Sequence, residues 1–173
     1  CGGGRNIAAL LKKYPQARVD GIDYSPLAVE RSIVLNASAI ACNRSQIRLG
    51  DVSELQIAPK TYELATAFET IYFWPGLEKC FTNVYNILKE GASFVVVCEC
   101  DGNDDMGKWF EKRIDGMKLY QAEEIERALM AAGFRDVKTI HHKWFPWIAV
   151  LARKDEAEEG QRAATNETHK GCA

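Results

Sequence analysis

The chain has 173 residues, of which 47% are hydrophobic and 27% are charged, and its formal net charge is −2 at pH 7. This length supports one packed domain rather than two ordinary ones. The mixed charges form no basic stripe of the kind that follows phosphates, so we expect no nucleic-acid partner. No apolar run approaches the length of a membrane span, and no charged-then-apolar leader begins the chain. We therefore expect a soluble, cytoplasmic protein with no membrane partner.

Six cysteines are scattered through the sequence without the paired CxxC spacing of a zinc site or a redox dithiol. We expect reduced thiols and no metal site. Cys98 and Cys100 lie two residues apart in an expected strand, so both would point to one face, where packing suits them better than disulfide chemistry.

A glycine cluster, the segment CGGG at residues 1–4, stands directly before a helical pattern over residues 6–14. Glycines let a ligand approach the backbone, and the free N–H groups of a helix N-terminus attract negative charge. Residues 18–23 alternate in polarity as a strand does, which places Asp23 and Tyr24 at its carboxyl end. An acidic side chain about 20 residues after such glycines can accept both hydroxyls of a ribose. The pattern predicts a site for a nucleoside-containing cofactor; the alternative is that the glycines form only a tight turn.

The middle of the chain continues as alternating helices and strands. Ser25 and Pro26 suit the N-cap and first turn of a helix. The apolar stripe of that helix consists of Val29, Ile33, Ala37 and Ile40. Strands are expected over residues 46–52, which end in Asp51 and Val52, and over residues 62–69, which end beside an aromatic cluster.

The next segments predict a helix, a buried strand and an insertion. An amphipathic helix carries Leu77, Phe81, Val84 and Leu88, and Gly91 stands where a left-handed cap would end it. Residues 93–100 are the most continuous apolar run and predict a strand buried on both faces. The insertion at residues 101–119 has apolar residues at helical spacing: Met106, Trp109, Phe110, Ile114 and Met117. Such a stripe usually belongs to the core; the alternative is a lid or substrate wall above the strand ends.

The last ordered part of the chain predicts a hairpin. A helix over residues 121–132 is followed by strands at residues 137–143 and 147–153, which are joined by only a few residues. A parallel crossover needs a dozen or more residues, so these strands must pair antiparallel. Alternating strands and helices predict a parallel sheet covered on both sides, here finished by an antiparallel strand. Residues 155–173 are acidic and polar, and we expect a disordered acidic tail.

Together these motifs resemble the class I S-adenosylmethionine-dependent methyltransferases over residues 1–154, which we expect to form one methyltransferase domain. The resemblance implies a Rossmann-like α/β fold whose doubly wound sheet is mostly parallel, with an antiparallel C-terminal strand. In that family the first strand ends in a loop of the form Asp/Glu-x-Gly-x-Gly-x-Gly, and Gly2 and Gly4 match its second and third glycines. The first strand would precede residue 1. We therefore expect an N-terminally truncated fragment of a longer protein, with two strand edges left unpaired.

The resemblance also assigns roles to the glycine loop and the first strand end. It implies that Gly2 and Gly4 bind the cofactor S-adenosylmethionine. It implies further that Asp23 binds the ribose hydroxyls of this cofactor and that Tyr24 lies beside the adenine.

The following strand ends carry the remaining expected site residues. By the same resemblance Asp51 faces the adenine amino group, the backbone N–H of Val52 contributes beside it, and Phe68 lies near the methionine moiety. If the methyl acceptor must lose a proton, a general base is required within hydrogen-bond reach. Glu69 is the expected base, and the other available residues of suitable type are Glu99, His141 and His142.

These expectations describe an enzyme, an S-adenosylmethionine-dependent methyltransferase that transfers a methyl group to a small-molecule acceptor. A sulfonium methyl is already activated, so positioning of the acceptor is the main expected contribution of the protein. Two alternatives stay open: a catalytically inactive cofactor-binding homologue and a nicotinamide-dependent reductase. The dinucleotide fingerprint wants a glycine or alanine three residues after its second glycine. If Gly2 and Gly4 are the first two glycines, that position is Ile7, whose bulk argues against a nicotinamide cofactor.

Overall fold

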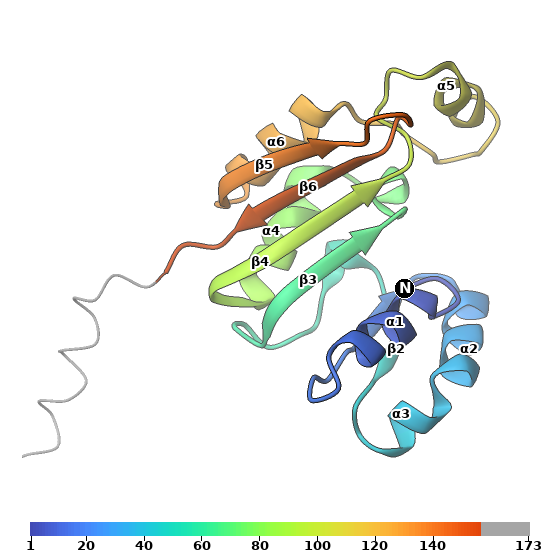
Figure 1. Cartoon of the computed structure of the whole chain (residues 1–173), viewed down its shortest axis with the longest axis vertical. Coiled ribbons are helices and arrows are strands. Elements are labelled where there is room, and N and C mark those ends of the chain that lie inside the picture. Colours follow the sequence, from blue (N-terminus) through green and yellow to red (C-terminus); the bar gives the residue numbers. More distant parts are fainter. Residues whose placement is uncertain (157–173) are drawn as a thin grey trace, which may run out of the picture.

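The computed structural model describes residues 1–156, in which helices and strands alternate along most of the chain (Figure 1). The helices are α1 (Arg5–Lys13), α2 (Pro26–Leu35), α3 (Ala37–Ala41), α4 (Leu77–Ile87), α5 (Asp105–Glu111) and α6 (Ala122–Ala131). The strands are β1 (Gly21–Asp23), β2 (Ile47–Leu49), β3 (Tyr62–Phe68), β4 (Leu88–Cys98), β5 (Arg135–His141) and β6 (Ile148–Arg153). Two short 3-10 turns, η1 (Val52–Glu54) and η2 (Ile71–Phe73), follow β2 and β3. The expected tail lies outside the described residues, apart from Asp155 and Glu156.

The strands form a two-stranded sheet and a four-stranded sheet. β1 pairs in parallel with β2, and the larger sheet has the order β3-β4-β6-β5. β3 and β4 are parallel, whereas β6 runs antiparallel to both of its neighbours, β4 and β5. The predicted antiparallel C-terminal strand is therefore confirmed. Because parallel strands end at the same edge of a sheet, the ends of β3 and β4 bring the loops that follow them to one edge.

The two sheets are not joined by backbone hydrogen bonds. Within residues 1–156, β1 pairs only with β2 and β3 only with β4, so each has one open edge, as expected from the sequence. Side chains bridge the gap instead: the Tyr62 hydroxyl donates to Asp20 Oδ2 at 2.9 Å, and Asn83 Nδ2 donates to the Val52 carbonyl at 3.0 Å. Figure 1 shows the β1–β2 unit and its helices as a group set below the larger sheet.

The main core lies between the larger sheet and helices α4 and α6, which Figure 1 shows on one face of that sheet. The Phe94 ring of β4 lies 5.5 Å from the Phe81 ring of α4 and 5.7 Å from the Phe134 ring, between centroids. Along β4 the residues alternate: Phe94 is buried, whereas Val95 is half-buried. The prediction that this strand is buried on both faces is wrong, because helices cover one face and leave the other partly open.

The helix after Ser25 begins as predicted but ends early. The Ser25 side chain accepts a hydrogen bond from the Ala28 N–H, and Pro26 opens the helix. α2 then stops at Leu35, and its buried residue is Ser32, whereas Ile33 of the predicted stripe is 41% exposed. The cause is tertiary: Asn36 turns inward and donates from Nδ2 to the carbonyls of Gly4 and Ser32. A polar contact with the glycine loop, rather than an apolar stripe, therefore determines which face of α2 is buried.

The glycine at position 91 is left-handed, as predicted, but it does not cap a helix. α4 ends at Ile87, and β4 begins at the next residue. Tyr62 pairs with Leu88 and Leu64 pairs with Ser93, so β4 holds extra residues at this point. Gly91, with φ +72°, permits this bulge because it has no Cβ.

The insertion after β4 also differs from the expected core packing. Four of its apolar residues are exposed: Met106 by 64%, Trp109 by 47%, Phe110 by 37% and Ile114 by 40%. The prediction of a core stripe is therefore wrong for these four side chains. The short helix α5 is set apart from the sheet, and no helix or strand within residues 1–156 buries these side chains (Figure 1).

All cysteines between residues 1 and 156 are free thiols, namely Cys1, Cys42, Cys80, Cys98 and Cys100. None of the helices between residues 1 and 156 is both long and apolar enough to cross a bilayer.

Candidate functional site

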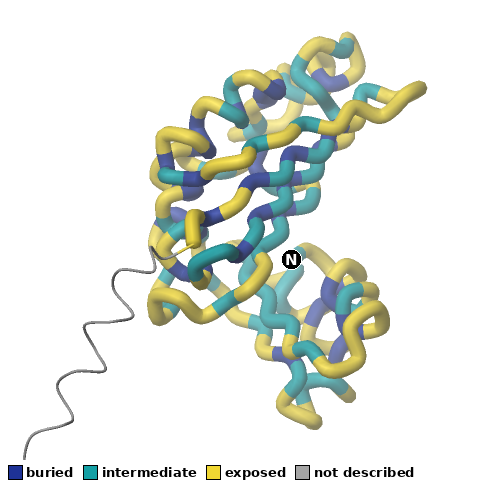
Figure 2. Tube along the Cα trace, turned by 60° about the vertical axis from the view of Figure 1, so that its left-hand side comes forward, coloured by how far each residue is buried: buried dark blue, intermediate teal, exposed yellow. Residues whose placement is uncertain are grey.

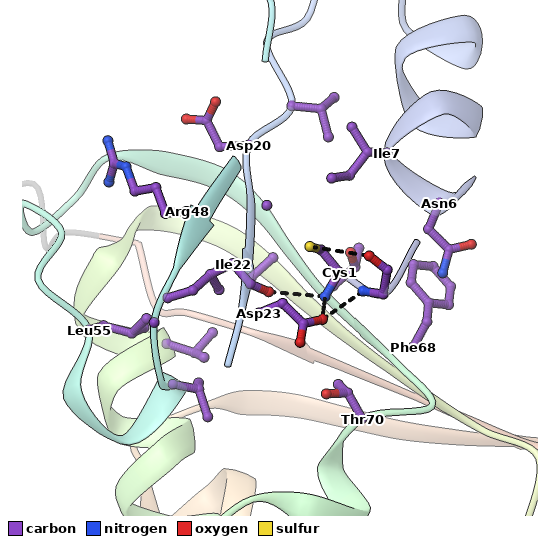
Figure 3. Close-up of a pocket in the computed structure, with 18 of the residues that line it drawn as sticks. Cys1, Asn6, Ile7, Asp20, Ile22, Asp23, Arg48, Leu55, Phe68 and Thr70 are labelled. Atoms are coloured by element: carbon purple, nitrogen blue, oxygen red, sulfur yellow. Dashed lines mark hydrogen bonds and ion pairs between the residues drawn. The ribbon is translucent and has the colours of Figure 1, made fainter. Parts of the chain in front are cut away.

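The glycine loop closes on Asp23 through a set of hydrogen bonds (Figure 3). The backbone nitrogen of Cys1 donates to Asp23 Oδ2 at 2.8 Å and to the Ile22 carbonyl at 3.0 Å. The Gly2 N–H donates to the same Oδ2 at 2.7 Å, and the Ser25 N–H donates to Oδ1 at 3.0 Å. The carboxylate at the end of β1 therefore holds both the glycine loop and the start of α2.

The surroundings of Asp23 favour its charged form. Burial raises the pKa of this carboxyl, but hydrogen bonds from the backbone nitrogens of Cys1, Ser25 and Gly2 lower it, and the net pKa lies below the usual value. Among the described residues Oδ1 accepts only from Ser25. A carboxylate oxygen has two lone pairs, so Asp23 keeps an acceptor position for a ligand hydroxyl.

Gly4 packs the loop against α2 and does not itself line the cavity described below. It is buried, its φ is +85°, and a Cβ added to it would lie 2.5 Å from Asn36 Nδ2 and 2.9 Å from Ser32 Cα. Gly3, in contrast, has no atom within 4 Å of an added Cβ. Packing and backbone conformation thus require a glycine at position 4, whereas the backbone at Gly3 is open to solvent or to a ligand.

A cavity of about 1090 Å³ lies between the two sheets, beside this loop. Ligand pockets commonly measure about 300–1,000 Å³, so this space exceeds the needs of one small ligand. Its walls come from the glycine loop and α1, from β1, from the segment after β2, and from β3 with its following turn. Figure 3 shows Cys1 hydrogen-bonded to Asp23, with Phe68 and Thr70 contributed by the end of β3 and the segment after it.

Asp51 and Val52 form the next part of the wall, after β2. Asp51 Oδ1 accepts from the Ser53 N–H at 2.7 Å and so caps the turn η1. As the first residue of this turn, Val52 has an N–H without an intrahelical acceptor. Asp51 is exposed, so its second carboxylate oxygen can accept a hydrogen bond from a ligand.

The end of β3 places Phe68 on the cavity wall, and Glu69 follows it directly, between Phe68 and the lining residue Thr70. Glu69 has φ +51°, a left-handed conformation that is strained for a residue with a side chain. Its Oε2 accepts from the Tyr72 hydroxyl at 3.2 Å, and that hydroxyl accepts from the Cys100 N–H. Burial and the nearby charge of Glu99 raise the pKa of Glu69. The carboxyl is therefore held in a fixed place beside the cavity.

The structure gathers most of the predicted site residues around one space. Those that line the cavity are Gly2, Asp23, Tyr24, Asp51, Val52 and Phe68, whereas Gly4 and Glu69 are next to lining residues in the sequence but do not line it themselves. The wall also holds Trp74 of the aromatic cluster after β3, together with Asn6 and Thr70, two residues that we did not assign to the site from the sequence. Their positions next to the glycine loop and the β3 end were the only signal that could have indicated them.

The two histidines considered as bases lie elsewhere. His141 ends β5 and His142 starts the turn to β6, and neither belongs to the cavity wall. His142 Nδ1 instead accepts hydrogen bonds from the N–H groups of Trp144 and Phe145, both at 3.2 Å. This ring therefore shapes the hairpin turn.

Comparisons with known proteins place this geometry in a family. The family model described as "Methyltransferase domain" matches residues 1–91. The sterol 24-C-methyltransferase of Clavispora lusitaniae is 24% identical over 165 residues, which cover 87% of this chain and 43% of that protein. Sterol methyltransferase-like 2 of Botryococcus braunii is 31% identical over 93 residues, which cover 54% of this chain and 23% of that protein. The chain thus spans less than half the length of these curated relatives.

A solved structure has the same fold at low sequence identity. The geranyl diphosphate C-methyltransferase of Streptomyces coelicolor A3(2), in complex with Mg²⁺, geranyl diphosphate and S-adenosyl-L-homocysteine, superposes with a TM-score of 0.78 and 12% identity. The match covers 89% of this chain and 70% of that one. The family match over the first half of the sequence, the glycine loop bound to Asp23 and the antiparallel last strand agree: the chain belongs to the class I S-adenosylmethionine-dependent methyltransferases.

Proposed function

We propose that this chain is the catalytic part of a methyltransferase that uses S-adenosylmethionine to methylate a small, largely apolar molecule. The observation that carries the proposal is the charged Asp23 carboxylate, which lies between the glycine loop and a large cavity and keeps an acceptor position free. A carboxylate at this place can accept the hydroxyls of a ribose.

The residues around the cavity fit the chemistry of this cofactor. Asp23 would accept from the ribose hydroxyls, and Tyr24, which is 64% exposed, has a free ring face for the adenine. Asp51 and the Val52 N–H would bind the polar edge of the adenine, and the open backbone at Gly2 and Gly3 would admit the amino-acid end. When bound, S-adenosylmethionine supplies a methyl group that its positive sulfonium already activates.

The acceptor side of the cavity is aromatic and apolar. Phe68, Phe73 and Trp74 belong to its wall and come from the end of β3 and the turn after it. Aromatic faces attract a sulfonium charge, bind apolar acceptors and keep water away from the reacting atoms. The two curated relatives carry sterol methyltransferase names, which supports an acceptor of this class.

Glu69 is the residue we propose as a general base. It follows Phe68 directly, is oriented by the Tyr72 hydroxyl and has a raised pKa. A carboxylate whose pKa lies closer to neutral accepts a proton from the acceptor more effectively than an ordinary one. The strained backbone at Glu69 fits a position that serves function rather than stability.

A nicotinamide cofactor is less consistent with the packing of the first helix. In the dinucleotide fingerprint a glycine on the helix permits close contact with the strand. Here Ile7 stands on the helix and Gly21 on the strand, where an added Cβ would lie 2.5 Å from Ile7 Cδ1. The close contact between α1 and β1 therefore depends on a glycine of the strand, not on a glycine of the helix. The loop and helix thus lack the third glycine of the dinucleotide fingerprint.

We further propose that a parallel strand from outside residues 1–156 pairs between β1 and β3. Both strands contribute residues to the cavity and have an edge of unpaired N–H and C=O groups, which can pair with another strand. Such a strand would fill part of the cavity and leave the part beside Asp23 for the cofactor.

The test is a calorimetric titration of the full chain with S-adenosylmethionine and, separately, with NADH. We expect binding of the first ligand only. Asp23→Asn keeps the side-chain volume but removes the charge, and a charged hydrogen bond contributes about 1.5–3 kcal/mol, so affinity should fall about tenfold to a hundredfold. Glu123→Gln, an exposed carboxylate in the first turn of α6, is the matched control and should leave affinity unchanged.

Methyl transfer is then measured with radiolabelled cofactor and a panel of sterols and isoprenoids. Glu69→Gln should keep cofactor affinity and lose turnover. Binding of NADH without S-adenosylmethionine would refute the proposed cofactor, and unchanged affinity in Asp23→Asn would refute the ribose role. Cofactor binding without turnover on any acceptor would favour the inactive homologue.

A further inference from the structure

The turn between β5 and β6 presents large aromatic side chains to solvent. We call residues 141–147 the hairpin tip. Within it Trp144 is 76% exposed, Phe145 54% and Trp147 42%. Single exposed apolar residues are common on protein surfaces, but a group of three aromatic residues in one short turn indicates a binding surface.

The hairpin tip has a defined internal structure. The His142 N–H donates to the Trp147 carbonyl at 2.8 Å, and His142 Nδ1 accepts from the N–H groups of Trp144 and Phe145. The Phe145 and Trp147 rings stack at 4.9 Å between centroids, with an angle of 22°. The aromatic side chains are therefore held outward by the turn itself, so binding would require little further ordering.

The hairpin tip carries a lysine and no acidic residue. Between Asp136 and Asp155 the sequence contains no acidic residue, and the exposed lysine and arginine side chains of this stretch are those of Lys138, Lys143 and Arg153. Within the tip, Lys143 Nζ lies 4.7 Å from the Trp144 ring centroid. A cation beside an indole matches the headgroup region of a bilayer, where tryptophan is enriched and where lysine reaches the phosphates.

The hairpin tip lies at the same end of the molecule as the candidate site. Cys98, the last residue of β4, pairs with Ile148, which follows the tip directly. The tip therefore stands at the edge where β3 and β4 end, as Figure 1 shows, and Figure 2 shows exposed chain at this end. The insertion with Trp109 and Phe110 leaves β4 at this edge too, but α5 carries Asp105 and Glu111 among its apolar residues and has a mixed charge.

We propose that the hairpin tip docks the protein on the surface of an anionic phospholipid bilayer. Trp144 and Phe145 enter the interface between headgroups and acyl chains, and Lys143 binds lipid phosphates. From the sequence we expected no membrane partner because no segment is long enough to span a bilayer, but a seven-residue tip that lies in the interface needs no such segment. Docking at this edge brings the end of β3, which contributes Phe68 to the cavity wall, to the membrane-facing end of the protein. The docking itself rests on the hairpin tip alone and is independent of the proposed methyl transfer.

The experiment is co-sedimentation of the full chain with vesicles of phosphatidylcholine alone and with an equimolar mixture of phosphatidylcholine and phosphatidylserine. We expect binding to the mixed vesicles and much weaker binding to the neutral ones. The double variant Trp144→Ala/Phe145→Ala should reduce the partition coefficient about tenfold or more, because two rings no longer leave water. Lys143→Ala should reduce it about fivefold on the anionic vesicles only.

Met130→Ala is the matched control, because Met130 is 49% exposed on α6, close to the start of β5 and so at the other end of the hairpin. It should bind as the unchanged chain does, and equal thermal midpoints of all variants would show that each one folds. Absence of binding to the anionic vesicles, or equal binding by the double variant, would overturn the proposal. Self-association of the unchanged chain in sedimentation analysis, abolished by the double variant and without vesicle binding, would show that the tip binds a second copy instead.

Discussion

The two parts of this molecule are held together in different ways. In the part that carries β1 and β2, the buried hydrophobic residues are Ile7 and Leu11, whereas all the others that are described, from Ala67 to Ala152, belong to the larger sheet, its helices and the segments that join them. The smaller part depends on polar contacts: Asp23 holds the glycine loop, and Arg44 donates to the carbonyls of Leu11, Tyr14 and Ala17. Most of the expected cofactor residues belong to this smaller part. The larger part therefore provides the stability, and the part that binds has little core of its own.

Removal of a ring from the larger core should have the greatest effect on stability. Phe94 is 1% exposed and contacts the rings of Phe81 and Phe134. Phe94→Ala should lower the free energy of unfolding by about 3–5 kcal/mol, measured by urea titration, because it leaves a cavity at the centre of the core. Ile140→Ala, which truncates a residue that is 64% exposed, is the control and should change it little. A loss below about 1 kcal/mol in Phe94→Ala would contradict the assignment of stability to this part.

Within the smaller part, one glycine should matter and its neighbour should not. Gly4→Ala forces a left-handed backbone on alanine, which costs about 1–2 kcal/mol, and brings its Cβ 2.9 Å from Ser32 Cα. We expect this variant to separate α1 from α2 and to weaken cofactor binding, measured by calorimetry. Hydrogen exchange should show faster opening of α1 and α2 while α4 and α6 stay protected. Gly3→Ala, whose Cβ meets no atom within 4 Å, should leave that opening unchanged, and equal effects of the two variants would contradict the packing role of Gly4.

The smallest expected effects are the opposite pH dependences of Asp23 and Glu69. The folded pKa of Asp23 lies below its reference value of 3.8, so its stabilising contribution is present above that pH and is lost as the pH falls toward the folded value. The folded pKa of Glu69 lies above its reference value of 4.5, so its contribution is present below that pH and is lost as the pH rises through the folded value.

Thermal midpoints measured as a function of pH test this pair. Asp23→Asn should lower the midpoint at neutral pH and converge with the unchanged chain in acid. Glu69→Gln should converge with it in acid and be equal or higher at neutral pH. Two variants with curves of the same shape would show that the environments of the two carboxyls do not differ in this way.

The local order of this fold could be predicted from the sequence because it depends on short-range rules. Ser25 and Pro26 mark a helix start wherever they stand before an apolar run, and a short link forces the last two strands to pair antiparallel. The same rules placed Asp23 and Asp51 at strand ends, which in a parallel sheet meet at one edge. The resemblance to the family then assigned roles to these positions.

The errors arose where distant residues decide the outcome. Asn36 follows an apolar helix, yet it turns inward because the carbonyl of Gly4 lies there to accept its hydrogen bond. The residues around Trp109 have the spacing of a core helix, but no element of the described residues covers them. Gly91 has the left-handed backbone expected of a helix cap, but it lies instead in a bulge of β4, whose position is set by the pairing of β4 with β3.

By itself, the sequence determined the class of fold, the order of elements and the residues at the strand ends, since periodicity, capping and link length are local properties of the chain. Only the tertiary structure decided which of those residues line the cavity, that Gly4 packs while Gly3 stays open, and that Glu69 is oriented by Tyr72. It also decided that three aromatic residues of the hairpin tip stand in solvent. These facts depend on distances between residues far apart in the sequence, and no local pattern encodes such distances.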